Sequence, residues 1–544
     1  MTKLTPHRYL NLVSALILFV ASPLLCAQTY NELHNFNWHK EGANPGGPAL
    51  LAQGLDGSLY GTLQTNFAAM GGHVGSVFNC APDGTVADLY NFLGKPDGST
   101  PQSGLSLGWD GNFYGTTERG GTSDKGTVFK YRDGVTTILY NFTDGADGAF
   151  PWAPPIQHPD GNIYGLTDNG TNPGRVYKIN PSTGAFSVIA ILPSQTIAPL
   201  ILGTDGNLYG TTPNGGTFNQ GTVFRLTTKG VLKIVHSFGT TGTDGRNPAG
   251  PVLQGADGKL YGTTNWGGVN GFGSVFVMST SGGGYKNLHD FQAIEGENPQ
   301  AGMVQGSDGF LYSVAVRGGA NSQGTLFKIN TTGTTFAVVH DFATASGDTP
   351  VSTLVLHTNG IIYGTTNHGG SQFPQYGVLY SFDNGLKPFT SLVIITSGHV
   401  GDAAGILGQG FLSATGVSFG NGPGQLIPIS DTAAIVSPLA GAMTGPIKVH
   451  IPTGDLVTPQ TFKVLPTISD FTPKSAPVGT VVTITGMSLK QTTSITIGKV
   501  VQSTFTVVSD TQVTTTVPLG AVTGKVSLKT KGGTAIARGL FTVQ

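Results

Sequence analysis

One phrase, Asp/Asn-Gly-x-(Leu/Ile/Phe)-Tyr-(Gly/Ser), recurs seven times between residues 56 and 364. Its tyrosines follow one another at intervals of 45 to 54 residues, at Tyr60, Tyr114, Tyr164, Tyr209, Tyr261, Tyr312 and Tyr363. A period of this length is typical of propellers and solenoids, in which each unit buries its apolar face against the next. The chain is therefore expected to form one tandem array, with these tyrosines packed between neighbouring units.

Each repeat contains four short runs of β-branched and aromatic residues separated by turn residues. In the unit at 103–142 the first turn is Asp110-Gly111, a Gly-rich loop follows the second run, and Arg132-Asp133-Gly134 precedes the fourth. Asp-Gly supplies the positive φ that a tight hairpin needs, and the residues of the runs suit a pleated surface. Each repeat is thus predicted to be a four-stranded antiparallel sheet, as in a propeller blade.

The fourth strand of the last repeat stands at the other end of the chain. Five other fourth strands end in phenylalanine and a weaker copy ends at Leu192. The copy that the last repeat lacks stands near the N-terminus as Glu32-Leu-His-Asn-Phe36. Closed propellers commonly complete the last blade in this way, which removes the open sheet edge. We predict an all-β protein with a seven-bladed β-propeller at 28–385, closed by residues 31–37 pairing with the blade of Tyr363 and Tyr380.

The C-terminal third has a different period. Segments 398–464 and 476–543 match each other at an offset of 78 or 79 residues, and each is a series of short Val/Ile/Thr runs with turn signals. Such a series has the size of a small antiparallel sandwich. We predict two immunoglobulin-like β-sandwich domains, at 386–465 and 466–544.

Two families resemble these segments. Roughly residues 30–385 resemble the repeat of the bacterial choice-of-anchor, or GloVer, proteins. The resemblance is carried by phrases such as DGNFYGTTERGGTSDKGTVF and DGNLYGTTPNGGTFNQGTVF. That resemblance implies an exported or surface protein and brings no established reaction or ligand. Gly479-Thr-Val-Val-Thr-Ile-Thr-Gly486 resembles the IPT/TIG family, which residues 401–408 match less well. In exported bacterial proteins, this resemblance implies a spacer or adhesive module.

The N-terminus and the composition limit the cellular setting. Residues 1–27 combine a basic start, an apolar stretch and Cys26-Ala27, which predicts a secretory signal peptide and an extracellular or cell-surface location. Cys80 then stays as a single buried thiol that cannot form an intramolecular disulfide. Charged residues make up 10% of the chain and the formal net charge is −1, which gives no basis for nucleic-acid binding. We expect a monomer with no membrane insertion after cleavage.

Candidate ligand-binding residues lie on one face of the predicted propeller. Strand topology places the Asp-Gly turns on one face and the variable loops on the other. Just before the Gly of each loop between the second and third strands stand Met70, Arg119, Asn169, Asn214, Trp266, Arg317 and His368. Tryptophan can stack on a sugar and arginine can pair with a carboxylate. Ordinary exposed loop tips are the alternative interpretation.

The loops between blades carry an acid-Gly-x-x-Pro element on the same face. Its acids, which we call the rim acids, are Glu41, Asp97, Asp147, Asp244, Glu295 and, in a shifted copy, Asp348. Carboxylates could bind Ca²⁺. However, this element is also a good turn, and one acid per blade leaves neighbouring carboxylates too far apart to share an ion. We therefore expect no metal and no cofactor.

These features favour a non-catalytic binding or adhesion protein. The His-Glu-x-x-His pair and the P-loop are absent from the sequence. The expected partner is an extracellular glycan or protein bound by the variable loops, with the sandwiches as spacers. The alternative is a propeller enzyme, a hydrolase or lyase that cleaves extracellular polysaccharide with rim carboxylates.

Overall fold

The computed structural model describes residues 28–37, 45, 51–64, 74–169, 172–373, 375–393 and 396–544, without the side chains of Asn169 and Asn172. Strands dominate this part of the chain, and the short 3-10 helices η2 (Thr344–Ser346) and η3 (Phe411–Ser413) interrupt them. No helix in these ranges is long and apolar enough to cross a membrane. The predicted all-β class is confirmed. The signal-peptide segment, Glu41 and Met70 lie outside the described residues.

Seven four-stranded antiparallel sheets follow one another along residues 29–383, and we number them repeat sheets 1 to 7. Sheets 1 to 3 consist of β2 (Ala52–Gln53), β3 (Leu59–Leu63), β4 (Ser76–Cys80) and β5 (Val86–Asn91); β6 (Ser106–Leu107), β7 (Phe113–Thr117), β8 (Thr127–Arg132) and β9 (Val135–Asn141); and β10 (Ile156–Gln157), β11 (Ile163–Asn169), β12 (Asn172–Ile179) and β13 (Phe186–Ile191). Sheets 4 and 5 consist of β14 (Ile201–Leu202), β15 (Leu208–Thr212), β16 (Thr222–Leu226) and β17 (Leu232–Ser237); and β19 (Leu253–Gln254), β20 (Leu260–Thr264), β22 (Ser274–Met278) and β23 (Lys286–Asp290). Sheets 6 and 7 consist of β24 (Val304–Gln305), β25 (Leu311–Ala315), β26 (Thr325–Ile329) and β27 (Phe336–Asp341); and β28 (Val355–Leu356), β29 (Ile362–Thr365), β30 (Val378–Asp383) and β1 (Thr29–Asn35).

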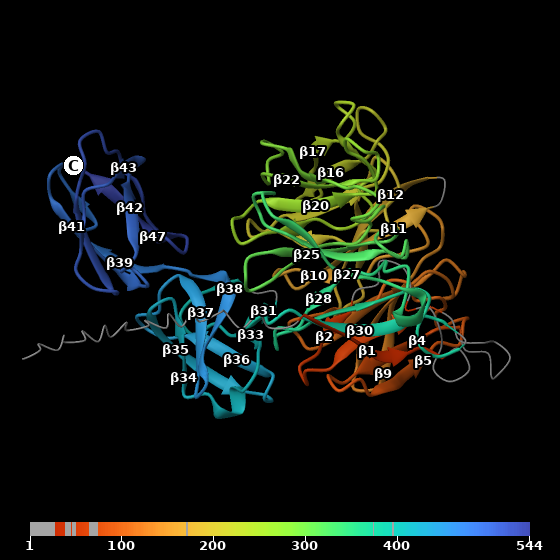
Figure 1. The fold of residues 1–544 in the computed structure, drawn as a ribbon. Helices are drawn as coiled ribbons and strands as arrows, with labels where there is room; N and C mark the ends of the chain where they lie inside the picture. Colours follow the sequence, from red (N-terminus) through yellow and green to blue (C-terminus); the bar gives the residue numbers. More distant parts are fainter. Residues whose placement is uncertain are drawn as a thin grey trace, which may run out of the picture.

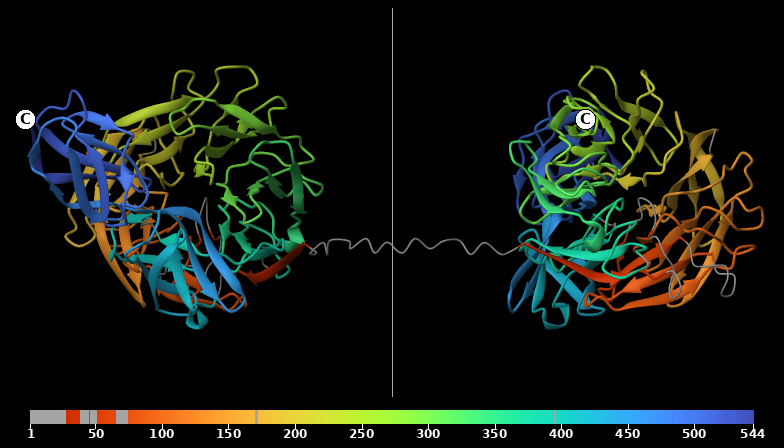
Figure 2. Two further views of the ribbon diagram at one scale, coloured as in Figure 1. Left: turned by 90° about the vertical axis from the view of Figure 1, so that its left-hand side faces the viewer. Right: turned by 45° about the vertical axis from the view of Figure 1, so that its right-hand side comes forward.

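These sheets are consistent with propeller-like blades, and Figure 2 shows them following one another around a ring. The glycine of each Asp/Asn-Gly turn has a φ between 79° and 90°, as the hairpin interpretation predicts. Each turn joins the first and second strands of its sheet, so all seven turns lie on one face of the ring. We call this the turn face, and we call the opposite face the loop face.

The ring is closed by the N-terminal strand. β1 pairs antiparallel with β30, from Thr29 opposite Asp383 to Asn35 opposite Val378, which confirms the predicted pairing. The joint between sheets 7 and 1, which we call the closing seam, uses the same hydrogen bond as three other joints. In each, a backbone N–H beside the Asp/Asn-Gly turn donates to the Gln Oε1 of the next sheet: Trp109 to Gln157, Thr204 to Gln254, Ala256 to Gln305, and Thr358 to Gln53 at the seam.

Apolar clusters fill the joints between neighbouring sheets. Tyr209 of sheet 4, for example, packs with Leu260 and Phe276 of sheet 5, and Tyr363 of sheet 7 packs with Leu59 and Phe78 of sheet 1. The predicted role of the repeated tyrosines in packing between units is therefore confirmed. Cys80 is fully buried in the cluster at the closing seam, where burial raises the pKa of its thiol to about 12.

Each repeated tyrosine also bonds to the Asp or Asn that opens its own phrase. The Tyr209 hydroxyl donates to Asp205 Oδ2 at 2.8 Å, and the same bond joins five further Tyr–Asp pairs of the repeats. In the last repeat Asn359 Nδ2 donates to the Tyr363 hydroxyl at 3.1 Å. Burial, with the adjacent Asp205, raises the pKa of Tyr209 to about 12, so this hydroxyl keeps its proton.

Residues 386–465 form a β-structure that packs on the ring. Its strands are β31 (Ser391–Val393), β32 (Ser397–Gly398), β33 (Ala404–Leu407), β34 (Gly416–Phe419), β35 (Gly422–Pro428), β36 (Ala433–Pro438), β37 (Gly445–Ile451) and β38 (Gly454–Val464). The Ser430 and Thr432 hydroxyls donate to the Leu55 carbonyl oxygen at 2.7 and 2.8 Å, and Val393 and Leu407 pack against Leu55. Because Leu55 precedes Asp56-Gly57, this domain sits on the turn face (Figure 1).

The second C-terminal domain repeats the strand order of the first. Its two sheets contain β39 (Thr467–Thr472), β41 (Val481–Met487), β45 (Gln512–Thr516) and β44 (Thr506–Val507), and β40 (Ser475–Ala476), β47 (Thr534–Val543), β46 (Gly524–Thr530), β42 (Thr492–Ile497) and β43 (Val500–Gln502). The offset of 78 or 79 residues predicted from the sequence reappears in the parallel pairs. Ser397 pairs with Lys463 in the first domain, and Ser475 pairs with Thr542 in the second.

Candidate functional site

The candidate residues of the loop face stand in short two-stranded ribbons. The loop between the second and third strands of a sheet pairs with the loop that arrives from the preceding sheet. The antiparallel pairs are Ser99 with Arg119, Arg246 with Trp266, Glu297 with Arg317, and Asp348 with His368. We call these pairs the loop ribbons. Sequence reasoning placed the two loops on the same face but did not show that they pair.

The structure places the candidate residues at the surface. Arg119, Asn214, Trp266, Arg317 and His368 are all exposed, and Trp266 exposes 49% of its surface. Asn169 ends β11, and its side chain is outside the described part of the structure, as is Met70. Exposure fits both interpretations of these positions, ligand contacts and ordinary loop tips. A candidate residue that lines a cavity is better placed to contact a ligand than one at an isolated loop tip.

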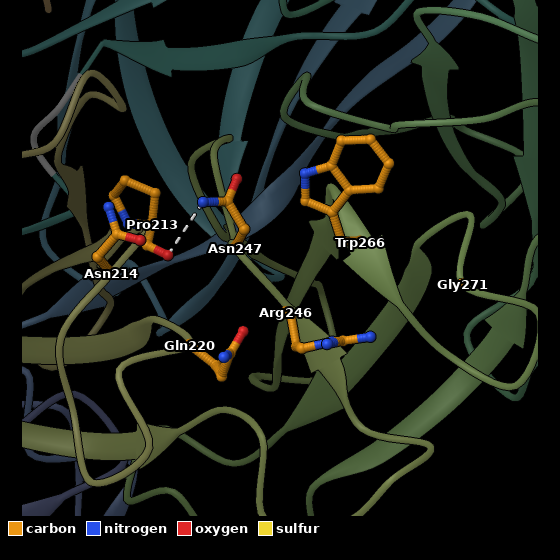
Figure 3. A pocket seen from close by; sticks show the side chains of 7 residues that line it. All are labelled: Pro213, Asn214, Gln220, Arg246, Asn247, Trp266 and Gly271. Carbon is orange, nitrogen blue, oxygen red and sulfur yellow. Dashed lines mark hydrogen bonds between the residues drawn. The ribbon is translucent and has the colours of Figure 1, made fainter.

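Asn214 and Trp266 do line a common pocket, which lies between sheets 4 and 5 and has a volume of about 310 Å³ (Figure 3). The loop between the second and third strands of sheet 4 contributes Pro213, Asn214 and Gln220. The other wall is a ribbon of β18 (Gly245–Arg246) and β21 (Trp266–Gly267) with its adjoining loops, and it contributes Arg246, Asn247, Trp266 and Gly271. Arg246, Asn247 and Gln220 were not predicted. Arg246 and Asn247 lie in the loop between blades, in which only the acid had been singled out, and Gln220 lies in the loop between β15 and β16, in which only Asn214 had been singled out.

Backbone geometry fixes the centre of this pocket. Asn247 adopts a φ of 57°, a left-handed conformation that asparagine tolerates better than most residues. Its N–H donates to the Gln220 carbonyl at 2.8 Å and its Nδ2 to the Pro213 carbonyl at 3.1 Å. These bonds connect the two loops that form the pocket walls, so the site is preformed without a ligand.

A comparison with sheets 2 and 3 explains why the pocket opens here. Phe150 precedes a proline in the loop between those sheets, as Asn247 does between sheets 4 and 5. The Arg119 guanidinium carbon and the Lys125 ammonium lie 5.3 and 5.1 Å from the centre of the Phe150 ring. An aromatic ring and two cations therefore occupy the equivalent place. Between sheets 4 and 5 the smaller Asn247 leaves this place open. Thr100, Asn298 and Thr349 do the same at other joints, so the pocket also depends on the loops that carry Asn214 and Trp266.

The rim acids bond to their own loops. Asp97 accepts from the Tyr90 hydroxyl at 3.0 Å and the Leu93 N–H at 3.1 Å, and Asp147 accepts from the Thr143 N–H at 2.8 Å. Burial raises the pKa of Asp97. In Asp147 burial has the same tendency, but hydrogen bonds from the Thr143 hydroxyl and N–H outweigh it and lower the pKa.

The remaining rim acids show the same behaviour. Asp244 accepts from the Gly239 N–H at 2.8 Å, Glu295 accepts from the Gln292 N–H at 3.0 Å, and Asp348 accepts from the Thr349 hydroxyl at 2.9 Å. A carboxylate that accepts such bonds acts as a cap for its turn. Among the described residues, no group of three or more His, Cys, Asp or Glu side chains is placed to hold a metal ion.

Comparison with known families identifies the chain. The family model described as the Gloeobacter/Verrucomicrobia repeat matches residues 20–173 and 153–380, which is most of the sequence. This chain belongs to the Gloeobacter/Verrucomicrobia repeat family. A second model, the IPT/TIG domain, matches residues 466–543 of this Gloeobacter/Verrucomicrobia repeat protein. Both resemblances seen in the sequence are confirmed, and the assignment of residues 386–465 to the IPT/TIG type stays a prediction. No curated protein matches the chain significantly.

Solved structures resemble this Gloeobacter/Verrucomicrobia repeat protein only in part. A surface glycan-binding protein from Prevotella bryantii is 20% identical over 27% of this chain and 38% of its own, with a TM-score of 0.22. A putative 6-phosphogluconolactonase from Bacteroides uniformis is 14% identical over 57% of this chain and 89% of its own, with a TM-score of 0.41. A fungal alcohol oxidase in complex with copper is 14% identical over 93% and 100%, with a TM-score of 0.40. Likeness at this level indicates no ligand.

Proposed function

We propose that this protein is an exported, non-catalytic binding protein that holds an extracellular glycan on the loop face of a seven-bladed propeller closed by β1. The observation that carries the proposal is the pocket between sheets 4 and 5, where the half-exposed Trp266 stands beside amide side chains. A protein ligand on the same face is the alternative partner.

The lining of the pocket suits a sugar. The apolar face of a pyranose ring stacks on an indole, and hydroxyl groups exchange hydrogen bonds with amides, which both donate and accept. Trp266 supplies the indole, and Asn214 and Gln220 supply the amides. A volume of about 310 Å³ is at the lower end of ligand pockets and suits one or two sugar residues of a longer chain.

The architecture supports export and a role outside the cell. Membership of the Gloeobacter/Verrucomicrobia repeat family and the N-terminal sequence agree with a surface or extracellular location. Seven four-stranded sheets support the propeller, and one hydrogen bond is shared by four of their joints, including the closing seam. Packing of residues 386–465 on the turn face leaves the loop face as the side on which a ligand binds.

A glycan array probed with residues 28–544 tests the proposal. Binding should fall by at least about ten-fold in Trp266→Ala, since loss of a stacked aromatic removes roughly 1 to 3 kcal/mol. The matched control is Trp109→Ala, because Trp109 is 46% exposed and lies beside Asp110 on the turn face. Equal losses in the two variants, or no binding by the unmodified protein to any glycan, would contradict the proposal.

The same array ligands test the enzymatic alternative. A hydrolase or lyase would shorten a bound polysaccharide, and turnover would disappear when one rim acid is replaced, as in Asp147→Asn. Because these carboxylates accept hydrogen bonds within their own turns, we expect Asp147→Asn to lower stability without affecting the ligand. Product analysis by mass spectrometry distinguishes the two outcomes.

A further inference from the structure

The lining of the pocket contains one cation, Arg246, which stands in the same ribbon as Trp266. Arg246 and Trp266 are opposite each other in the antiparallel register of β18 and β21. Residues directly opposite in such a pair project to the same face, about 5 Å apart at Cβ. Figure 3 shows both side chains in the wall of the pocket. A ligand that stacks on Trp266 therefore comes within reach of the Arg246 guanidinium.

Arg246 differs from the other arginines of the loop ribbons. Arg317 is opposite Glu297 in its ribbon, and Arg119 has Glu118 at 3.7 Å. By contrast, Arg246 is opposite an aromatic residue, and no carboxylate of the described residues lies within 4 Å of its guanidinium. The pocket lining holds no acidic side chain. The only charge in the lining is thus an exposed cation that has no counterion among the residues the structure describes.

We infer that the pocket binds an acidic sugar residue, one that carries a carboxylate, within the glycan. This inference rests on the proposed function and narrows it. The pyranose ring stacks on Trp266, and the carboxylate pairs with the Arg246 guanidinium, whose planar fork matches a carboxylate in two parallel hydrogen bonds. The Asn214 and Gln220 amides are left for hydroxyl groups. Neutral sugars could use only the indole and the amides.

Calorimetric titration of residues 28–544 with acidic oligosaccharides tests the inference. The ligands are oligosaccharides of galacturonate, glucuronate and mannuronate, and each is compared with its carboxyl-reduced neutral counterpart. At least one acidic form should bind about ten-fold or more tightly than its reduced form, a difference appropriate to a partly exposed charge-assisted hydrogen bond. That difference should decrease as the salt concentration rises. Arg246→Gln should abolish it, and Arg246→Lys should retain part of it.

The control variant is Arg132→Gln, because Arg132 is exposed and its Nη1 donates to the Asp110 carbonyl on the turn face. It should leave the preference unchanged, and circular dichroism and melting curves establish that each variant is folded. Equal affinity for acidic and reduced forms, or binding on the array of neutral glycans alone, overturns the inference and leaves the proposed function standing. Absence of binding to every glycan overturns both.

Discussion

The tyrosine and the acid of each repeat act together on the turn face. Asp257, for instance, accepts the Lys259 N–H, which fixes the tight turn, and its second oxygen accepts the Tyr261 hydroxyl at 2.8 Å. One carboxylate therefore joins the hairpin to the tyrosine that packs between sheets. The sequence showed both residues in six repeats and Asn359 with Tyr363 in the seventh, but their bond depends on the hairpin bringing positions four apart together.

Because of this arrangement, removal of the tyrosine hydroxyl should lower the free energy of unfolding by different amounts in different repeats. Tyr261→Phe should lower the free energy of unfolding by about 2 kcal/mol, because the bond to Asp257 involves a charged acceptor. Tyr363→Phe should lower it by about 1 kcal/mol, since Asn359 is a neutral partner. Both tyrosines are buried, so each variant serves as the control for the other. Equal decreases in the free energy of unfolding, measured with urea, would disprove the role given to the charged Asp257 acceptor.

A buried histidine makes the closing seam sensitive to acid. His357 Nε2 lies 2.9 Å from the Gly57 carbonyl of sheet 1, and its Nδ1 accepts the Asn359 N–H at 3.1 Å. Both nitrogens of the neutral ring are thus used. Burial lowers the pKa of His357, although the hydrogen bond to the Gly57 carbonyl and an interaction with the Asn359 side chain oppose the shift. A second proton would have to go on Nδ1, where it would face the Asn359 N–H.

The sign of the resulting pH effect follows from the lowered pKa. As the pH falls below about 6.5, the unfolded chain takes up a proton before the folded chain does, so the free energy of unfolding decreases. Between pH 7 and about pH 5, His357→Gln should therefore show a smaller pH dependence of stability. The dependence should not vanish, because burial also lowers the pKa of His236 and His340. An unchanged slope in His357→Gln would contradict the argument.

At the scale of elements, the N-terminal strand behaves as an ordinary fourth strand. Where sheets 5 and 6 meet, His289 stacks on Phe336 with ring centres 3.7 Å apart. Between sheets 6 and 7, His340 stacks in the same way on Tyr30 of β1, at 3.9 Å. A segment more than 300 residues away in the chain thus reproduces the local packing of a continuous repeat.

This equivalence predicts similar costs for two distant substitutions. Tyr30→Ala and Phe336→Ala each remove an aromatic ring from such a stack, and each should lower the free energy of unfolding by about 2 to 4 kcal/mol. Deletion of residues 28–40 should cost more and expose the edge of β30. Differential scanning calorimetry measures all three changes. A deletion variant that melts like the full chain would show that β1 does not close the ring.

The sequence predicted the elements better than the site. Hairpin turns, the repeated sheets and the origin of β1 follow from local patterns, because Asp-Gly and alternating apolar residues determine strand and turn within a few positions. The pocket depends on two loops meeting. Trp266 and Asn214 were among seven equivalent candidates. The pairing of Arg246 with Trp266 and the pocket that these loops enclose distinguish their site from the others.

For the whole molecule, the two C-terminal domains stand in different relations to the ring. The first covers the closing seam: Thr358, which bonds to Gln53 of sheet 1, also donates its hydroxyl to the Gly408 carbonyl at 3.0 Å. The second domain contacts the first, where the Gly441 N–H donates to Asp510 at 3.1 Å, and Figure 1 shows it beyond the first domain and apart from the ring. A spacer role therefore suits the second domain better than the first.

Two truncations separate these roles. A chain that ends at residue 465 should keep the melting temperature of the ring, because the contacts at the seam come from residues 386–465. A chain that ends at residue 385 should melt several degrees lower, since it exposes Leu55 and Leu107 and loses the bonds of Thr358 to Gly408 and Gln409. Differential scanning calorimetry of the full chain and the two truncated chains, without added glycan, measures the differences in melting temperature. If both truncations melt alike, the first domain is attached to the ring without stabilising it, and its contact with the seam serves only to orient the second.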